Sequence, residues 1–387
     1  MSGKGKTDPG SGSAQAKTEA SGKTGSSSGG SSGGSFGGGQ NSGGQGSGSV
    51  TDEQLNAAIN VLTGGVGARR EGEAFGDAYE LPNLTSYCET CAAIGNVYTN
   101  WRMFLLHGSS KYYDVLERTL YNGVLSGVSL DGGTFFYPNP LESDGRHQRQ
   151  DWFGCACCPS NIARFIPSVA GYVYAVRGDD LYVNLYMANR MSDKLKSGGV
   201  ALTMDTDYPW KGDVAITVDQ APAKGFTLRL RIPGWVRNEV LPSDLYSYAD
   251  DLQPGYKVLV NGTEVQAGLE EGYFCISRKW KAGDRVELVM DMPARTVKAH
   301  PAVKDDEGRL AIEKGPIVYC AEWPDNPGVQ VREAVLGPAP QLSVRHDAEK
   351  LYGIDEISVG DGALTLIPYY AWNHRGAGDM AVWLKTE

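Results

Sequence analysis

The chain has 387 residues, 41% of them hydrophobic and 21% charged, which is enough for two or three domains with their own cores. Its formal net charge of −10 disfavours a nucleic-acid partner, because nucleic acids are bound through clustered Lys and Arg. No apolar run approaches the roughly 20 residues of a membrane span, and Met1 to Val50 lacks the apolar stretch of a signal peptide, so we expect a cytoplasmic protein without a membrane partner.

Residues 1–50 consist mostly of glycine and serine, and Phe36 is their only aromatic residue. Such a segment cannot bury enough apolar surface to offset its loss of conformational entropy, so we expect it to be disordered. Its composition fits a flexible linker and a dispensable extension equally well.

Residues 51–176 are expected to be mostly helical. Asp52 is placed to cap a first helix, and apolar residues recur at helical spacing over residues 91–106 and again over 111–125. Pro159 marks the first turn of a further helix. A loop or short hairpin over residues 132–140 is expected to bring Tyr137 towards the cysteines that precede Pro159.

After Arg177 the hydrophobic period falls to two, and short strands alternate with Gly, Pro and Asp turns. Strands of this length without intervening helices predict antiparallel β-sandwich packing. We expect one sandwich over residues 177–297 and a second β-rich sandwich domain over residues 298–387. The predicted fold class is therefore a helical part followed by two antiparallel β-sandwich-like domains.

Most of the cysteines lie in two short clusters. Cys88 and Cys91 are three residues apart and would share one face of a helix, so their spacing favours a four-thiol zinc site with the adjacent pair Cys157 and Cys158. Glu89 and Cys91 can converge on one ion only if the segment begins in irregular backbone. Buried thiols without a metal are the third alternative, and the cysteine pattern leaves all three open.

A catalytic site also needs a group that moves protons. Glu71 and Glu73 lie in a loop with nearby glycines, which would let the backbone approach a ligand closely and aim a carboxylate at it. Solvated loop charge is the simpler interpretation of these two residues.

Several motifs resemble those of the β-L-arabinofuranosidases of glycoside hydrolase family 127. They are spread in order over residues 51–387: Gly72-Glu73-Ala74-Phe75-Gly76, Tyr87-Cys88-Glu89-Thr90-Cys91, Phe136-Tyr137-Pro138-Asn139-Pro140, Cys157-Cys158-Pro159-Ser160-Asn161, Arg231-Ile232-Pro233-Gly234-Trp235 and Pro368-Tyr369-Tyr370-Ala371-Trp372. Several ordered motifs identify a family better than they identify one sugar.

In that family a glutamate and three cysteines hold zinc, and one of the cysteines attacks the sugar. The resemblance implies four zinc ligands: Glu89, Cys91, Cys157 and Cys158. That assignment sets Cys88 aside, contrary to the spacing argument.

The resemblance also implies a mechanism. Cys157 would be the nucleophile, Glu73 the general acid/base, and Tyr137 a contact to the sugar or to the thiolate. The expected reaction is hydrolysis, with retention, of a terminal β-linked L-arabinofuranose in an oligosaccharide or glycoconjugate.

The family's catalytic domain resembles an (α/α)6 barrel, and residues 51–176 supply only part of such a ring. We therefore expect either a fragment of a longer enzyme or a chain that self-associates to complete its barrel. An incomplete ring would expose the apolar side chains of Tyr98, Trp101, Phe104 and Leu105. Two alternatives follow: a non-catalytic, zinc-stabilised remnant that binds carbohydrate or a partner, and an enzyme that acts on another pentoside.

Overall fold

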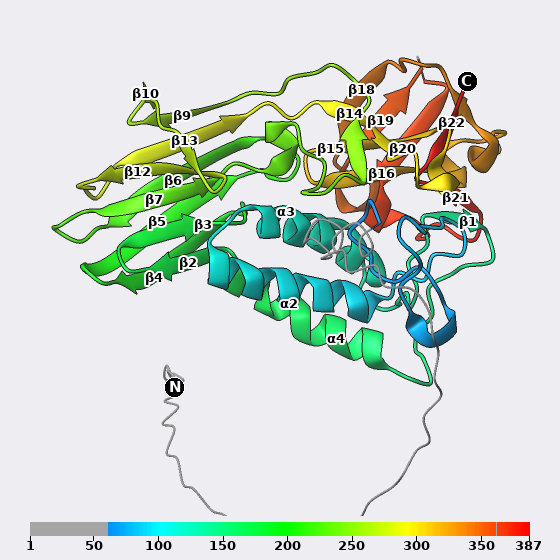
Figure 1. Ribbon diagram of the computed structural model, residues 1–387, viewed down its shortest axis with the longest axis horizontal. Helices are drawn as coiled ribbons and strands as arrows, with labels where there is room; N and C mark the ends of the chain where they lie inside the picture. The colour runs from blue at the N-terminus through cyan, green and yellow to red at the C-terminus, as the bar shows by residue number, and fades with distance from the viewer. Residues whose placement is uncertain (1–60, 361) are drawn as a thin grey trace, which may run out of the picture. The chain divides into compact units, whose positions relative to one another are not determined.

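The computed structural model describes residues 61–360 and 362–387 (Figure 1). The predicted disorder of residues 1–50 and the predicted helix after Asp52 lie outside these residues. The described part begins with loops and helices and continues with antiparallel sheets, which confirms the predicted fold class. None of its helices is long and apolar enough to cross a membrane.

Three α-helices are found in the described residues: α2 (Thr90–His107), α3 (Lys111–Arg118) and α4 (Cys157–Phe165). The helix predicted over 111–125 changes its winding after α3, to a π-helical segment at Thr119–Val124 and a 3-10 turn at Leu125–Gly127. Helix α4 begins two residues before Pro159, so that Cys157 and Cys158 form its first turn. A 3-10 segment, Ile166–Tyr172, leads from α4 to the first sheet.

Helix α2 buries one face and exposes the other. Ile94, Val97 and Phe104 are buried, at the three- and four-residue spacings that share a helix face. The predicted exposure of Phe104 was wrong, because its ring packs edge-on against Tyr113 at a centroid distance of 4.8 Å. Leu105 is 54% exposed, in agreement with its predicted exposure.

The strands form three sheets, which contain five, six and eleven strands. The five-stranded sheet has the order β11-β12-β7-β3-β2, and the six-stranded sheet has the order β10-β9-β13-β6-β5-β4. The largest sheet contains β1, β8 and β14–β22. Neighbouring strands are antiparallel except for the β3–β7 and β17–β22 pairs.

The strand bounds are β1 Glu142–Asp144, β2 Tyr174–Arg177, β3 Asp180–Val183, β4 Asn189–Leu195, β5 Gly198–Thr206, β6 Asp213–Gln220, β7 Phe226–Arg231, β8 Tyr246–Tyr248, β9 Tyr256–Val260, β10 Thr263–Val265, β11 Leu269–Glu270, β12 Tyr273–Arg278, β13 Arg285–Met290, β14 Ala294–Ala299, β15 Arg309–Lys314, β16 Ile317–Glu322, β17 Val335–Leu336, β18 Leu342–Asp347, β19 Ile354–Val359, β20 Leu364–Pro368, β21 Asp379–Ala381 and β22 Leu384–Thr386. The predicted boundary between residues 297 and 298 falls inside strand β14, which pairs with β15 and β8. The domain boundaries stay predictions.

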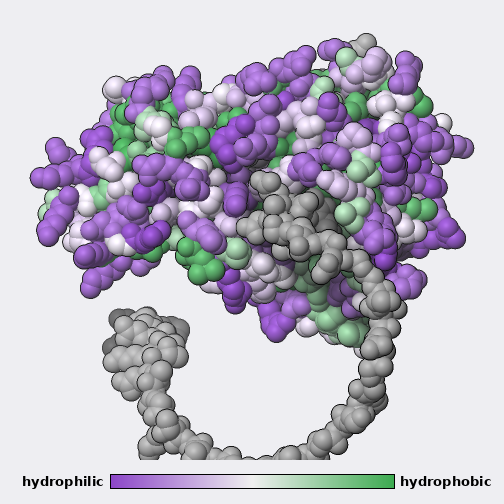
Figure 2. Space-filling model, in the orientation of Figure 1, coloured by the Kyte–Doolittle hydropathy of each residue, from purple (hydrophilic) through white to green (hydrophobic). Residues whose placement is uncertain are grey.

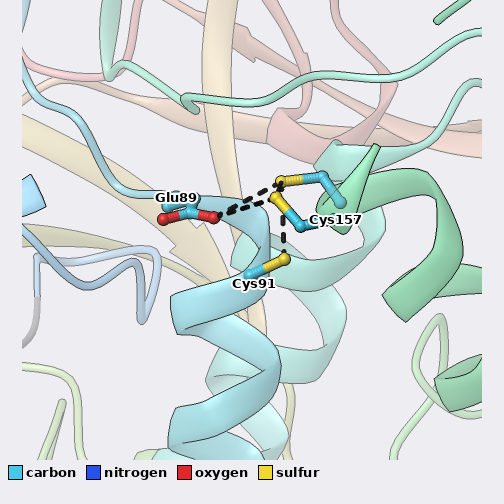
Figure 3. A group of neighbouring side chains, drawn as sticks. Glu89, Cys91 and Cys157 are labelled. Atoms are coloured by element: carbon cyan, nitrogen blue, oxygen red, sulfur yellow. Dashed lines mark hydrogen bonds between the residues drawn. The ribbon is translucent and has the colours of Figure 1, made fainter. Parts of the chain in front are cut away.

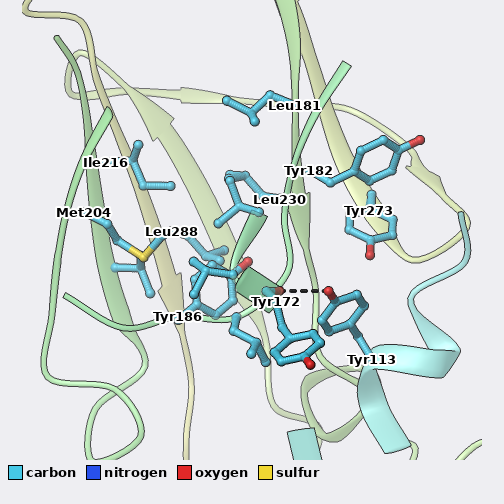
Figure 4. Close-up of a cluster of buried hydrophobic side chains, with 14 of the residues drawn as sticks. Tyr113, Tyr172, Leu181, Tyr182, Tyr186, Met204, Ile216, Leu230, Tyr273 and Leu288 are labelled. Carbon is cyan, nitrogen blue, oxygen red and sulfur yellow. Dashed lines mark hydrogen bonds between the residues drawn. The ribbon is translucent and has the colours of Figure 1, made fainter. Parts of the chain in front are cut away.

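One hydrophobic cluster joins the helices to the five- and six-stranded sheets (Figure 4). Tyr113 on α3 donates a hydrogen bond of 2.8 Å to the Tyr172 carbonyl, and Leu230 on β7 packs in the same cluster. A second cluster joins Val115 on α3 to Val318 and other residues of the largest sheet. Helix α3 thus packs against both β regions. On the face shown in Figure 2, hydrophilic side chains predominate and hydrophobic ones form scattered patches.

Helix α3 also carries buried charges that pair with both β regions. Arg231 on β7 is fully buried and bonds Asp114 at 2.8 Å and Glu117 at 2.5 Å. Arg118, the last residue of the helix, pairs with Glu313 on β15 at 2.7 Å. A buried charge that loses its partner is costly, so these pairs fix the position of α3 between the sheets.

Replacing Arg231 with Met should therefore destabilise the protein. Asp114 and Glu117 would lose a buried counter-charge, and we expect a loss of roughly 3–5 kcal/mol in the free energy of unfolding, measured with urea. Arg229, two residues earlier on β7, is the control because its partners Asp180 and Glu270 are both accessible to solvent, and Arg229→Met should cost about 1 kcal/mol or less. Equal losses in both variants would contradict the assignment.

Candidate functional site

The start of α2 separates two neighbouring side chains. Cys88 adopts a left-handed backbone conformation with φ of 37°, and its amide donates to the Gly67 carbonyl at 2.8 Å. Its thiol is buried 2.9 Å from the Ser86 hydroxyl. Glu89 is extended and immediately precedes the helix, so its carboxylate and the Cys91 sulfur in the first turn point to the same place. This irregular start is what a Glu89–Cys91 pair requires.

The loop that carries Tyr137 is fixed to the same helix start. The Thr90 amide donates to the Tyr137 carbonyl at 3.0 Å, and the Asn139 side chain donates to the Cys88 carbonyl and the Thr90 hydroxyl, each at 2.9 Å. The Ser126 hydroxyl holds the Asn139 amide oxygen at 2.8 Å. Tyr137 is therefore placed by buried hydrogen bonds.

Helix α4 supplies the other two sulfurs. Cys157 and Cys158 are its first two residues, and Pro159 follows at a position where a missing amide proton costs no helical hydrogen bond. Cys158 is buried, whereas Cys157 is partly accessible. In Figure 3, Glu89, just before α2, and Cys91, in its first turn, face Cys157 from α4.

The donor atoms of Glu89, Cys91, Cys157 and Cys158 all lie within 4.8 Å of one another. The Cys158 sulfur lies 3.6 Å from that of Cys91 and 3.7 Å from that of Cys157. Glu89 Oε1 lies 3.6 Å from the sulfurs of both Cys157 and Cys158. A tetrahedral zinc ion with Zn–S bonds of about 2.3 Å would hold sulfurs about 3.8 Å apart and a carboxylate oxygen about 3.5 Å from each sulfur. The four side chains fit such an ion.

The three thiols interact too closely to ionise independently. The hydrogen bond with Cys158 lowers the pKa of Cys91 to about 7, and the same contact raises the pKa of Cys158. Burial raises the pKa of Cys157 to about 11. In the absence of a cation, Cys157 therefore remains a thiol at neutral pH.

Glu73 is linked to Cys157 through two tyrosines. The Tyr87 hydroxyl donates to Glu73 Oε1 at 2.8 Å, and the rings of Tyr87 and Tyr137 lie 6.2 Å apart. The Tyr137 hydroxyl lies 3.0 Å from the Cys157 sulfur. Glu73 itself has φ of 49°, a conformation that costs free energy for a non-glycine residue and often marks a functional position.

Glu73, Tyr87 and Tyr137 line one cavity of about 710 Å³. Cys155, which is exposed, and His147 also line this cavity. The volume is in the range of small-molecule binding sites.

Two contacts at the site were missed by the sequence reasoning. Tyr87 lies within a quoted motif, yet nothing in the motif indicated its hydrogen bond to Glu73. Asn161 closes the Cys157-Cys158 motif, and its side-chain amide donates to the Cys91 sulfur at 2.9 Å. The only sequence signal for Tyr87 and Asn161 was that each lies in a motif that resembles the family.

Comparison with known families gives matches along the described chain. The β-L-arabinofuranosidase GH127 catalytic domain matches residues 53–171, the GH127 middle domain matches 180–292, and the glycoside hydrolase family 127 C-terminal domain matches 294–385.

Individual relatives agree with these matches. A non-reducing end β-L-arabinofuranosidase of Bifidobacterium longum subsp. longum is 36% identical over 84% of this chain and 53% of its own length. A solved GH127 β-arabinofuranosidase is 56% identical, with a TM-score of 0.83 over 86% of this chain and 54% of its own. A GH127 β-L-arabinofuranosidase from Geobacillus stearothermophilus T6 is 37% identical, with a TM-score of 0.77 over 87% and 55% of the two chains. The chain thus spans about half the length of these relatives.

The metal content of variants tests the four-residue cluster. If the cluster binds zinc, the purified protein should hold about one equivalent by atomic absorption, and Cys158→Ala should lose it, because one of the four candidate ligands is removed. Cys88→Ala is the matched control, since it removes a buried thiol outside the cluster, and it should retain the metal. Loss of zinc from Cys88→Ala with retention in Glu89→Gln would instead indicate a four-thiol site.

Proposed function

This chain belongs to glycoside hydrolase family 127, and from that premise we propose that it hydrolyses a terminal β-linked L-arabinofuranose with retention of configuration. The observation that carries the proposal is the chain of contacts from Glu73 through Tyr87 and Tyr137 to the Cys157 sulfur. Glu73, the candidate proton-transfer group, lines the cavity together with Tyr137, and the sulfur of Cys157, the candidate nucleophile, lies 3.0 Å from the Tyr137 hydroxyl.

We further propose that the metal is zinc, held by Glu89, Cys91, Cys157 and Cys158. Bound zinc would keep its cysteine ligands deprotonated at neutral pH. The distances among the four donor atoms support this ligand set. Cys157 is the natural nucleophile among the three sulfurs, because it is partly accessible and contacts Tyr137, which lines the cavity.

In the first step the Cys157 sulfur attacks the anomeric carbon and forms a C–S bond as the glycosidic C–O bond breaks. Glu73 gives its proton to the departing oxygen. Tyr87 holds the Glu73 carboxyl group in place through its 2.8 Å hydrogen bond. The sugar is thereby transferred to the enzyme with inversion.

In the second step Glu73, now a carboxylate, takes a proton from water as the water oxygen attacks the anomeric carbon. The C–S bond breaks and its electron pair returns to Cys157. The Tyr137 hydroxyl, 3.0 Å from that sulfur, can donate a hydrogen bond to the departing thiolate. Two inversions give overall retention.

The proposed substrate is an arabinose-containing oligosaccharide or glycoconjugate. The cavity offers Tyr137 and Phe153 as aromatic surfaces, with their rings 5.4 Å apart. Comparing aryl glycosides of several pentoses would separate an arabinofuranosidase from an enzyme for another pentoside. Zinc binding without any turnover would favour the carbohydrate-binding remnant instead.

Glu73→Ala should lower turnover of a natural-type substrate by about 10²- to 10⁴-fold, the usual contribution of general acid–base catalysis. With a nitrophenyl β-L-arabinofuranoside, whose leaving group needs little protonation, formation of the glycosyl-enzyme should be less affected. Added azide should then restore release and give the β-arabinosyl azide, identified by NMR.

Glu71→Ala is the matched control, because Glu71 lies in the same turn but does not bond Tyr87. Its turnover should stay within about twofold of the wild type, as expected for an exposed loop charge. Cys157→Ser should abolish turnover with every substrate. Full activity in Cys157→Ser, or an azide product of inverted configuration, would refute the mechanism.

A further inference from the structure

The last residue of the Cys157-Cys158 motif reaches across to the other helix. Asn161 lies four residues after Cys157 on α4, so the two side chains share a helix face. Its Nδ2 atom lies 2.9 Å from the Cys91 sulfur on α2. Asn161 is half-buried and thus partly protected from competing water.

The orientation of this amide is set by a second residue. Arg164 donates a hydrogen bond to Asn161 Oδ1. A guanidinium group is only a donor, so it can face the amide oxygen but not the amide nitrogen. The NH₂ group is therefore directed to the sulfur, which accepts the bond.

The three sulfurs of the cluster consequently have different surroundings. Cys91 accepts a hydrogen bond from Asn161, Cys157 contacts the Tyr137 hydroxyl at the cavity, and Cys158 is buried. An N–H donor withdraws electron density from a thiolate, which makes it a weaker nucleophile but keeps it oriented as a ligand.

We propose that Asn161, oriented by Arg164, is a positioning residue that holds the Cys91 sulfur as a non-reacting metal ligand. The reaction is thereby left to Cys157. The proposal rests on the proposed function in one respect, which is that the cluster binds a metal.

The test uses Asn161→Leu, which keeps a side chain of similar size but removes the donor. Zinc affinity would be measured by competition with a chromophoric chelator, and the sulfur-to-metal charge-transfer band would be recorded after Co²⁺ substitution. We expect affinity to fall by about 10- to 100-fold, as for other groups that orient a ligand. The band should move to longer wavelength, because the sulfur lone pairs lose a stabilising hydrogen bond.

Two further variants keep the test decisive. Arg164→Gln should lower the zinc affinity and move the Co²⁺ band in the same direction as Asn161→Leu, but by a smaller amount. Because Arg164 is exposed, this variant should fold even if Asn161→Leu does not. Ser160→Ala, on the same turn, is the control and should leave both unchanged, since the Ser160 hydroxyl bonds only backbone carbonyls of Ala156 and Cys157.

The outcomes separate this inference from the proposed function. Wild-type affinity and an unshifted band in Asn161→Leu, or in Arg164→Gln if that variant alone folds, would overturn the role of Asn161 while leaving the metal site intact. A wild-type protein that binds neither Zn²⁺ nor Co²⁺ would overturn both.

Discussion

Three thiols and a carboxylate share a space in which they cannot all be ionised without a cation. Their donor atoms lie within 4.8 Å of one another, and two like charges 4 Å apart repel by about 4 kcal/mol at an effective dielectric constant of 20. Without a metal, the hydrogen bond with Cys91 raises the pKa of Cys158, and burial raises the pKa of Cys157. A divalent cation would reverse this balance, which is why the proposed nucleophile, Cys157, is proposed together with a metal.

The fold places the four donors at the N-terminal ends of two helices, α2 and α4. Glu89, just before α2, and Cys91 in its first turn meet the two cysteines in the first turn of α4, and the positive end of a helix dipole favours negative charge at such positions. Helix α3 packs on α2 in the same core and is held by Arg231 and Glu313 in the sheets. Buried ion pairs add little net stability, but a displaced α3 would leave charges unpaired.

Much of the secondary structure could be predicted from periodicity, because helices and strands bury faces with different spacing. The apolar spacing over 91–106 predicted α2 to within a residue at either end. The sequence could not show that Phe104 is buried, because its partners Tyr182 and Tyr273 lie far along the chain. Strand β5 buries Val200, Leu202 and Met204 in alternation, as the period of two after Arg177 predicts.

The site was predictable only in part. The spacing argument favoured Cys88 as a ligand because it treated residues 88–91 as a regular helix. In the structure the left-handed backbone of Cys88 turns its thiol into the core, and Glu89 faces the other sulfurs instead. The family resemblance supplied what spacing could not. Hydrogen bonds such as Asn161 to Cys91 join residues 70 positions apart, and no local pattern encodes them.

In the proposed site, one carboxylate and three thiolates hold a zinc ion, and the ligands include the nucleophile. This ligand set can be measured by X-ray absorption at the zinc edge of the purified protein. We expect three sulfur neighbours at about 2.3 Å and one oxygen at about 2.0–2.2 Å. Four sulfur neighbours, or a first shell without sulfur, would contradict it.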